Sequence, residues 1–103
     1  MVSTNQPLSI DRDQLLPVLR DLEYILISLH KIGSHYAADL PEKHQDYCAE
    51  TTRFIDQAQV TQRLAKIRSV LSGAFDQTRG EDDLTEVERA LEGLAFWAPT
   101  DPR

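Results

Sequence analysis

From Leu15 to Leu40, apolar or small side chains recur at alternating steps of four and three residues. This series, called the leucine seam below, consists of Leu15, Leu19, Leu22, Leu26, Leu29, Gly33, Tyr36 and Leu40. Such steps keep side chains on one side of an α-helix, whereas a strand would repeat every second residue. The spacing, which resembles a coiled-coil heptad, predicts a long helix from Pro17 to about Leu40. Its predicted core face combines residues of the seam with other apolar residues and consists of Leu22, Leu26, Leu29, Tyr36, Val18, Ile25 and Ile32. Pro41 ends this helix, because the residue before a proline avoids the helical conformation.

The start of this helix has two interpretations. Asp11 and Gln14 have the spacing of a capping box, which marks a helix N-terminus. Pro17 lies too far beyond that cap to be a first-turn proline, and a proline inside a helix disrupts it. Either a short turn at 11–15 precedes the helix, or one long helix is kinked at Pro17. Residues 1–10 are expected to form a flexible N-terminal segment.

Two more helical stripes follow Pro41. A second helix is predicted from about Glu42 to Ala58. The next stripe does not continue the phase of that helix, and it consists of Val60, Leu64, Ile67, Leu71 and Ala74. No glycine or proline marks the change of phase, so two helices that meet near 57–60 and one long bent helix both fit the pattern. Gly80 is expected to end this part, because glycine adopts the left-handed conformation of a helix C-cap at low cost.

A last helix is predicted from an N-cap at Asp83, with Glu86 three residues on, to Ala98. Its stripe consists of Leu84, Val87, Leu91, Leu94 and Ala98. Pro99 stops the helix, and residues 99–103 form a short polar tail. Short connections favour antiparallel neighbours. The sequence therefore predicts an all-α fold, a small antiparallel bundle of three to four amphipathic helices, formed by a single domain over residues 11–98.

The first helix carries apolar side chains on a second side as well. Leu16, Tyr24 and Ile27 fall well away from the middle of the leucine seam on a helical wheel. A helix of so small a bundle is rarely enclosed on all sides, so this second side predicts contact with another chain. Phe96 and Trp97 fall off the last stripe, and tryptophan is enriched at the energetic centres of interfaces. These five residues form the predicted partner interface, and the sequence predicts a homodimer.

Charge is spread unevenly along the chain. It has 11 Lys and Arg against 17 Asp and Glu, a net charge of −6. This balance argues against nucleic acids and anionic membranes as partners. An acidic patch is predicted at Glu81, Asp82, Asp83 and Glu86. These acids suit the dipole at the start of a helix, and the alternative is that they dock a basic partner protein.

Cys48 is the only cysteine, so no disulfide forms within the chain, in keeping with a reducing compartment. The N-terminus has no basic region followed by an apolar run, which a signal peptide requires. The longest uncharged apolar run, 24–29, is far shorter than the about 20 residues that cross a bilayer. The protein is therefore predicted to be soluble and cytoplasmic.

Residues that bind metals occur in pairs rather than in larger groups. His44 and Cys48 share a helix face at a spacing of four residues, as do His35 and Asp39. A structural zinc site takes four ligands, and a catalytic one takes three and a water. The Glu-x-x-His motif of helical di-metal sites does not occur. No catalytic, cofactor-binding or metal-binding residue is therefore predicted, and no cofactor.

These features predict a non-enzymatic helical protein–protein interaction module that self-associates, such as an adaptor, a small regulator or an immunity-type inhibitor. Its expected partner is another protein, and a basic one fits the acidic patch. The alternative is a small helical enzyme, or a bundle that binds a metal or small molecule, with a polar centre near His30, His44 and Cys48. An enzyme needs a pocket with convergent polar groups, whereas an interaction module presents an apolar patch.

Overall fold

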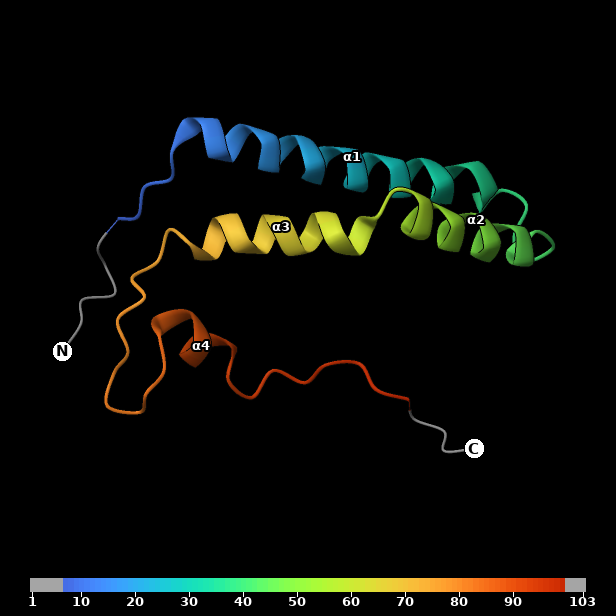
Figure 1. Ribbon diagram of the computed structural model, residues 1–103. Coiled ribbons are helices and arrows are strands. Elements are labelled where there is room, and N and C mark those ends of the chain that lie inside the picture. The colour runs from blue at the N-terminus through green and yellow to red at the C-terminus, as the bar shows by residue number, and fades with distance from the viewer. Residues whose placement is uncertain (1–6, 100–103) are drawn as a thin grey trace.

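The computed structural model describes residues 7–99 and contains four helices in that part of the chain. They are α1 (Arg12–Ala37), α2 (His44–Gln57), α3 (Val60–Ser72) and α4 (Glu86–Leu91). α1 runs antiparallel to α2 and α3, which follow one another along its length, and α4 lies on the other side of α3 (Figure 1). The predicted all-α bundle is confirmed. Parts of the predicted N-terminal segment and polar tail, 1–6 and 100–103, lie outside the described residues.

α1 is one long helix that begins at Arg12, continues through Pro17 and ends at Ala37. Of the two interpretations of its start, the structure has the long helix rather than a separate turn. The proline lacks the N–H that a second-turn residue normally donates, but the helix resumes its pattern beyond it. The leucine seam is therefore helical as far as Tyr36, and Leu40 lies in the turn to α2.

α2 and α3 are separate helices, and Gln59 interrupts the helical path between them. This residue has a φ of 54° and a ψ of 49°, which is the left-handed conformation. One left-handed residue shifts the phase of the helix that follows it, which explains why the stripe of α3 does not continue that of α2. For a residue other than glycine this conformation costs about 1–2 kcal/mol. α3 ends at Ser72, well before the predicted end at Gly80.

The prediction of a long last helix capped by Asp83 was wrong in its length and in its cap. α4 covers only Glu86–Leu91, and its N-cap is Thr85. The Thr85 hydroxyl accepts the N–H of Glu88, and the Glu88 carboxylate accepts the N–H of Thr85, which completes a capping box. Asp83, with a φ of 63°, and Gly93, with a φ of 82°, adopt left-handed conformations outside the helix. The flanking Thr85 and Glu92 have extended backbones, so the helix ends at both sides of Glu86–Leu91.

The core is small, and on α1 it lies along one edge of the predicted core face. Its buried hydrophobic residues are Val18 and Ile25 of α1 and Val60 and Ile67 of α3. Leu26, the central member of the leucine seam, is 64% exposed, whereas its neighbour Ile25 is 7% exposed. The predicted core face is therefore confirmed at Val18 and Ile25 and wrong at Leu22, Leu26 and Leu29.

Two contacts explain this rotation of α1. Nη1 of Arg63 lies 2.6 Å from Oδ1 of Asp21, and the ring of Tyr24 lies 5.6 Å from that of Phe54. Asp21 and Tyr24 lie on the side of the Ile25 stripe that is remote from the seam, so these contacts draw that side toward α2 and α3. The apolar arc of α1 is wider than one neighbouring layer covers, and much of the seam is left uncovered.

The helices form an open layer rather than a closed globule (Figure 1). The radius of gyration is 18.6 Å and the extents are 56 × 41 × 22 Å. A compact domain of about 100 residues has a radius of gyration of about 13 Å. The small core and the open shape leave apolar surface that helices of the same chain do not cover. Among residues 7–99, no helix has the length and apolar character needed to span a membrane.

Candidate protein interaction surface

The uncovered leucines of α1 form one continuous stripe. We call Leu19, Leu22, Leu26 and Leu29 the open leucine face, and all four are exposed. At a rise of 1.5 Å per residue the stripe is about 15 Å long, and the half-buried Leu15 and Gly33 extend it at its ends. Side chains with this spacing fill the contact between paired helices in a coiled coil. The open leucine face therefore has the pattern of a helix-pairing surface.

α3 adds apolar side chains on the same side of the layer. On α1, Leu22 stands three residues before the buried Ile25, and Leu29 stands four residues after it. Leu64 and Leu71 have these same offsets from the buried Ile67, and both are exposed. Equal offsets on two antiparallel helices point to the same side of the pair. The apolar surface of α1 therefore continues across the layer onto α3.

α4 occupies part of this surface at the C-terminal end of α3. A hollow of about 500 Å³ lies between the two helices. α3 lines it with Leu64 and Leu71, the chain just beyond α3 lines it with Phe75, and α4 lines it with Val87 and Leu91. The lining is almost entirely apolar, so α4 lies against the α3 part of the apolar surface.

The structure places the three predicted interface residues of α1 on two different sides. Leu16 and Ile27 are exposed on the side that faces away from α2 and α3, where they border the open leucine face. Tyr24 is turned toward α2 and α3, where it contacts Phe54. The guanidinium carbon of Arg63 also lies 4.8 Å from the centre of the Tyr24 ring. Tyr24 is therefore engaged within the chain, although its ring remains partly exposed.

The open leucines themselves were missed as surface residues, because sequence reasoning assigned them to the core. The signal that identifies them was present in the alternating steps of three and four. That pattern belongs to helices that pair with other helices, whether in one chain or between chains. The exposed Leu26 shows that the middle of the pattern is not used for pairing with α2 or α3, whereas Tyr36 near its end contacts Tyr47 of α2.

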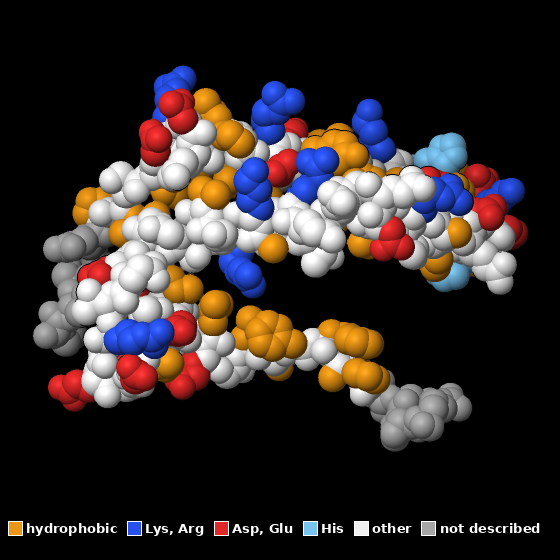
Figure 2. Space-filling view, viewed as in Figure 1, with side chains coloured by type: hydrophobic (Ala, Val, Ile, Leu, Met, Phe, Trp, Pro, Cys, Tyr) orange, Lys and Arg blue, Asp and Glu red, His pale blue; other side chains and the backbone are white. Residues whose placement is uncertain are grey.

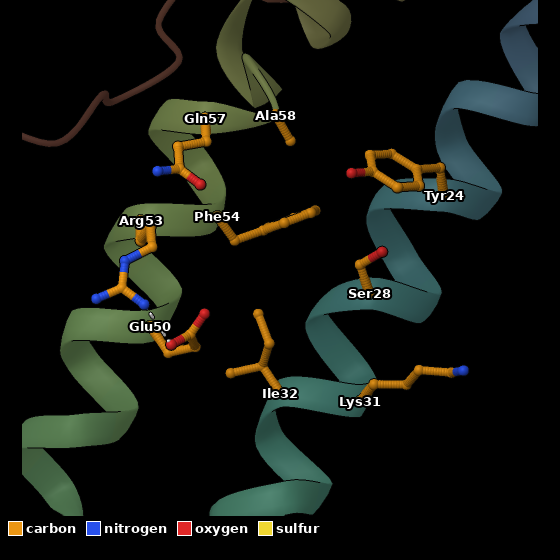
Figure 3. A pocket seen from close by; sticks show the side chains of 9 residues that line it. All are labelled: Tyr24, Ser28, Lys31, Ile32, Glu50, Arg53, Phe54, Gln57 and Ala58. Carbon is orange, nitrogen blue, oxygen red and sulfur yellow. Dashed lines mark hydrogen bonds and ion pairs between the residues drawn. The ribbon is translucent and has the colours of Figure 1, made fainter.

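The layer also has a polar side. Figure 2 shows Lys and Arg side chains distributed along α1 and along α2 and α3. A hollow of about 440 Å³ between α1 and α2 is lined by the nine residues of Figure 3. Within it, Arg53 donates a 2.8 Å hydrogen bond to Glu50, and Tyr24 and Phe54 contribute aromatic rings. Because Arg53 neutralises Glu50, this hollow presents no unpaired carboxylate for a metal ion or for proton transfer.

The other two predicted interface residues, Phe96 and Trp97, are almost fully exposed. Phe96 is 79% exposed and Trp97 is 85% exposed. They belong to segment 92–99, which follows α4 without helical structure (Figure 1). Figure 2 shows open space between this segment and the helices above it. These aromatic side chains therefore make little contact with the rest of the described chain.

Arginines partly neutralise the predicted acidic patch. Arg89 donates two hydrogen bonds of 2.8 Å to the carboxylate of Asp82. These bonds hold the pKa of Asp82 far below its usual range. Arg79 donates a hydrogen bond of 2.5 Å to the backbone oxygen of Asp83. The remaining carboxylates of the predicted patch are those of Glu81, Asp83 and Glu86.

The alternative polar centre is only partly assembled. Nε2 of His44 and Sγ of Cys48 lie 3.4 Å apart on α2, and Cys48 is an exposed free thiol. His30 lies on α1 and is also exposed. Within residues 7–99, no group of three or more His, Cys, Asp or Glu side chains is placed to hold a metal ion. The pair on α2 supplies two ligands, fewer than a zinc site takes.

No protein-family model matches this sequence, and comparisons with curated proteins and with solved structures give no significant match. What the open leucine face does is therefore inferred from the residues that form it.

Proposed function

We propose that this protein is a non-enzymatic protein–protein interaction module that self-associates through α1. The observation that carries the proposal is the exposure of the open leucine face on a long helix, with Leu26 at 64%. Apolar surface in contact with water is unfavourable, and contiguous apolar patches on a soluble chain mark interaction sites. A second helix laid along α1 removes that surface from water.

The rest of the molecule supports an interaction role. The core contains few buried side chains, and the shape is open. A partner that covers the apolar side of the layer would bury the hydrophobic side chains that this chain leaves exposed. Obligate homodimers commonly have no stable folded monomer for this reason. An adaptor, a small regulator and an immunity-type inhibitor all act through such contacts without a reaction of their own.

A second kind of partner fits the C-terminal part of the chain. The exposed Phe96 and Trp97 follow a segment that carries the acidic Glu81, Asp83 and Glu86. Aromatic anchors beside acidic side chains suit a basic protein with an apolar pocket. The exposed thiol of Cys48 suits a reducing compartment, and the cytoplasm is the proposed location.

Absolute mass in solution tests the proposal. Light scattering over a concentration series is expected to give the mass of a dimer, with dissociation only at the lowest concentrations. Leu26→Asp is expected to shift the protein to the monomer mass, because a carboxylate would then lie in the apolar contact. Far-UV circular dichroism checks that the helices are retained.

Arg20→Asp is the matched control. It places the same aspartate at an exposed position of α1 that lies outside the open leucine face. We expect this variant to keep the dimer mass. A wild-type protein that stays monomeric over the whole series would contradict the proposal, as would equal effects of the two aspartates.

One contact favours the alternative function, a bundle that binds a metal or a small molecule. His44 and Cys48 are already in contact on α2, and a third ligand from a second copy or a ligand molecule would complete a site. A chelator is then expected to lower the melting temperature, and Cys48→Ser is expected to abolish that effect. An interaction module without a metal shows the same melting temperature with and without chelator.

A further inference from the structure

We infer that α1 binds α1 of a second copy of this chain in antiparallel orientation, with a two-fold axis beside Leu26. This pairing rests on the proposed self-association and gives it a specific contact. The surface involved is the open leucine face, extended at its ends by Leu15 and Gly33. The second copy is favoured as its occupant by symmetry, by shape and by area.

The leucine seam is nearly symmetric about Leu26. Its helical members stand 4, 7 and 11 residues before Leu26 and 3, 7 and 10 residues after it. A two-fold axis at Leu26 therefore brings every helical member of the seam opposite another member on the second copy. The resulting layers pair Leu26 with Leu26, Leu22 with Leu29, Leu19 with Gly33, and Leu15 with Tyr36.

Gly33 favours the antiparallel direction. A Cβ atom added at this glycine would meet no atom within 4 Å, so the space above it is open. In the antiparallel pair, Leu19 of the second copy enters that space, and its side chain fills the volume that the glycine leaves empty. In a parallel pair, Gly33 would lie opposite Gly33, and the unfilled layer would lose its packing contacts.

The area needed for a stable dimer exceeds that of α1 alone. A stable interface covers about 800 Å² on each partner. α1 has 26 residues, so it is about 39 Å long and about 10 Å wide, which supplies about half of that area. Ile55 follows Phe54 on α2 as Leu26 follows Ile25 on α1, so on these antiparallel helices the exposed Ile55 lies on the same side of the layer. It supplies further contact on a part of the layer that α4 does not cover.

The character of the surface also suits a second copy. No member of the leucine seam is charged, so the pairing buries no unpaired charge. A two-fold pair is closed, and it leaves neither copy of the face uncovered. Each chain carries a net charge of −6, so added salt is expected to strengthen the pairing by screening the repulsion between copies.

Disulfide crosslinking tests the geometry. In a Cys48→Ser background the chain has no native thiol, and single cysteines are introduced at Leu26, Leu22 or Leu29. Diamide accepts the two electrons and two protons released when two thiols form a disulfide. We expect Leu26→Cys to crosslink to itself, and most of the chain to run at twice the monomer mass on a non-reducing gel. Arg20→Cys, outside the face, is the control and is expected to stay uncrosslinked.

A mixture determines the direction of the pairing. Leu22→Cys and Leu29→Cys are mixed, one of them carrying an affinity tag so that the mixed product has its own size. The antiparallel pair predicts the mixed product as the main one. This second measurement remains informative if the cysteine at Leu26 weakens the dimer.

Each outcome separates this pairing from the proposed function. A dimer mass with self-crosslinked Leu22→Cys and Leu29→Cys would show a parallel pair and overturn the geometry, while self-association would stand. A dimer mass without crosslinks at any of the three positions would place the contact on another face. That result would also overturn the geometry and leave self-association standing. A monomer mass at all concentrations would overturn both.

Discussion

Nη1 of Arg63 donates a hydrogen bond of 2.6 Å to Oδ1 of Asp21, and this ion pair joins α3 to α1. The same side chain donates from Nε to the carbonyl oxygen of Ala58, 2.8 Å away, at the end of α2. Its guanidinium also lies over the ring of Tyr24. Arg63 therefore holds α1 against the point where α2 and α3 meet.

We expect Arg63→Lys to lower the free energy of unfolding by about 1–2 kcal/mol, because one ammonium group does not maintain three contacts in different directions. The side chains of Arg63 and Asp21 are 39% and 25% exposed, so solvent weakens the ion pair, and the other two contacts carry much of the effect. Urea unfolding measures the loss. Arg68→Lys, on the exposed part of α3, is the control and should change stability by less than about 0.5 kcal/mol. Equal losses would contradict this role of Arg63.

Ile25→Ala and Leu26→Ala distinguish the core stripe of α1 from the open leucine face. Ile25→Ala should cost about 2–4 kcal/mol at every protein concentration, because it leaves a cavity. Leu26→Ala should cost less than about 1 kcal/mol at the lowest concentration. Its cost should grow as concentration rises, since dimerisation stabilises the wild type by mass action. Thermal unfolding over a concentration series measures both losses of stability. Equal losses at the lowest concentration would show that Leu26 belongs to the core of the single chain.

Gln59→Gly should raise the free energy of unfolding by about 0.5–1 kcal/mol. Glycine adopts the left-handed conformation of residue 59 without the steric cost that a Cβ atom brings, and this gain exceeds the entropy that glycine adds to the unfolded chain. Gln62→Gly, at an exposed position inside α3, should instead lower it by about 1 kcal/mol. Urea unfolding of both variants checks the signs. A loss at residue 59 would mean that the left-handed turn is not required there.

Gly33→Leu should act in opposite directions on the single chain and on the dimer. Leucine is the better helix former by about 0.8 kcal/mol, and the open space above Gly33 admits the new side chain in the single chain. In the antiparallel pair it would collide with Leu19 of the second copy. Light scattering should therefore show weaker self-association while circular dichroism shows no loss of helix. Adding Leu19→Ala to Gly33→Leu should restore part of the association, and failure to do so would argue against that layer.

The structure around α4 should weaken in acid. Hydrogen bonds from Arg89 hold the pKa of Asp82 below its ordinary value, and the backbone N–H of Thr85 does the same for Glu88. Because the folded pKa values lie below the unfolded ones, this stabilisation is complete above about pH 4–5 and decreases as the pH falls through the folded values. Amide shifts of Leu84 and Thr85 followed by NMR should report the change. In Asp82→Asn the acid dependence at Leu84 should disappear.

The fold class could be predicted from local sequence patterns. The errors concern features that depend on contacts between residues far apart in the sequence. The phase change between Ala58 and Val60 marked the break at Gln59, since periodicity is a local signal. The side of α1 that is buried depends on the pair of Asp21 and Arg63, 42 residues apart, and no helical wheel contains that contact. The predicted core face of α1 correctly contained Val18 and Ile25, but it also contained the leucines of the seam, which are exposed.

The last helix shows a different limit. Asp83 with Glu86 and Thr85 with Glu88 offer two capping boxes of identical spacing, and the sequence alone ranks neither. The folded chain uses Thr85, because Asp83 lies in the left-handed region. Gly93 lies inside the predicted helix and adopts a left-handed conformation, which is typical of a glycine just beyond a helix C-terminus.

The exposure of Trp97 gives the protein its own optical reporter. It is the only tryptophan of the chain and is 85% exposed, so its indole fluorescence reports on the C-terminal segment alone. If pairing is confined to the open leucine face of α1, segment 92–99 takes no part in it, and the emission is expected to stay unchanged. A protein that docks on the segment covers the ring and moves the emission to shorter wavelength. The unmodified chain can therefore distinguish, in one cuvette, assembly with itself from capture of a different partner.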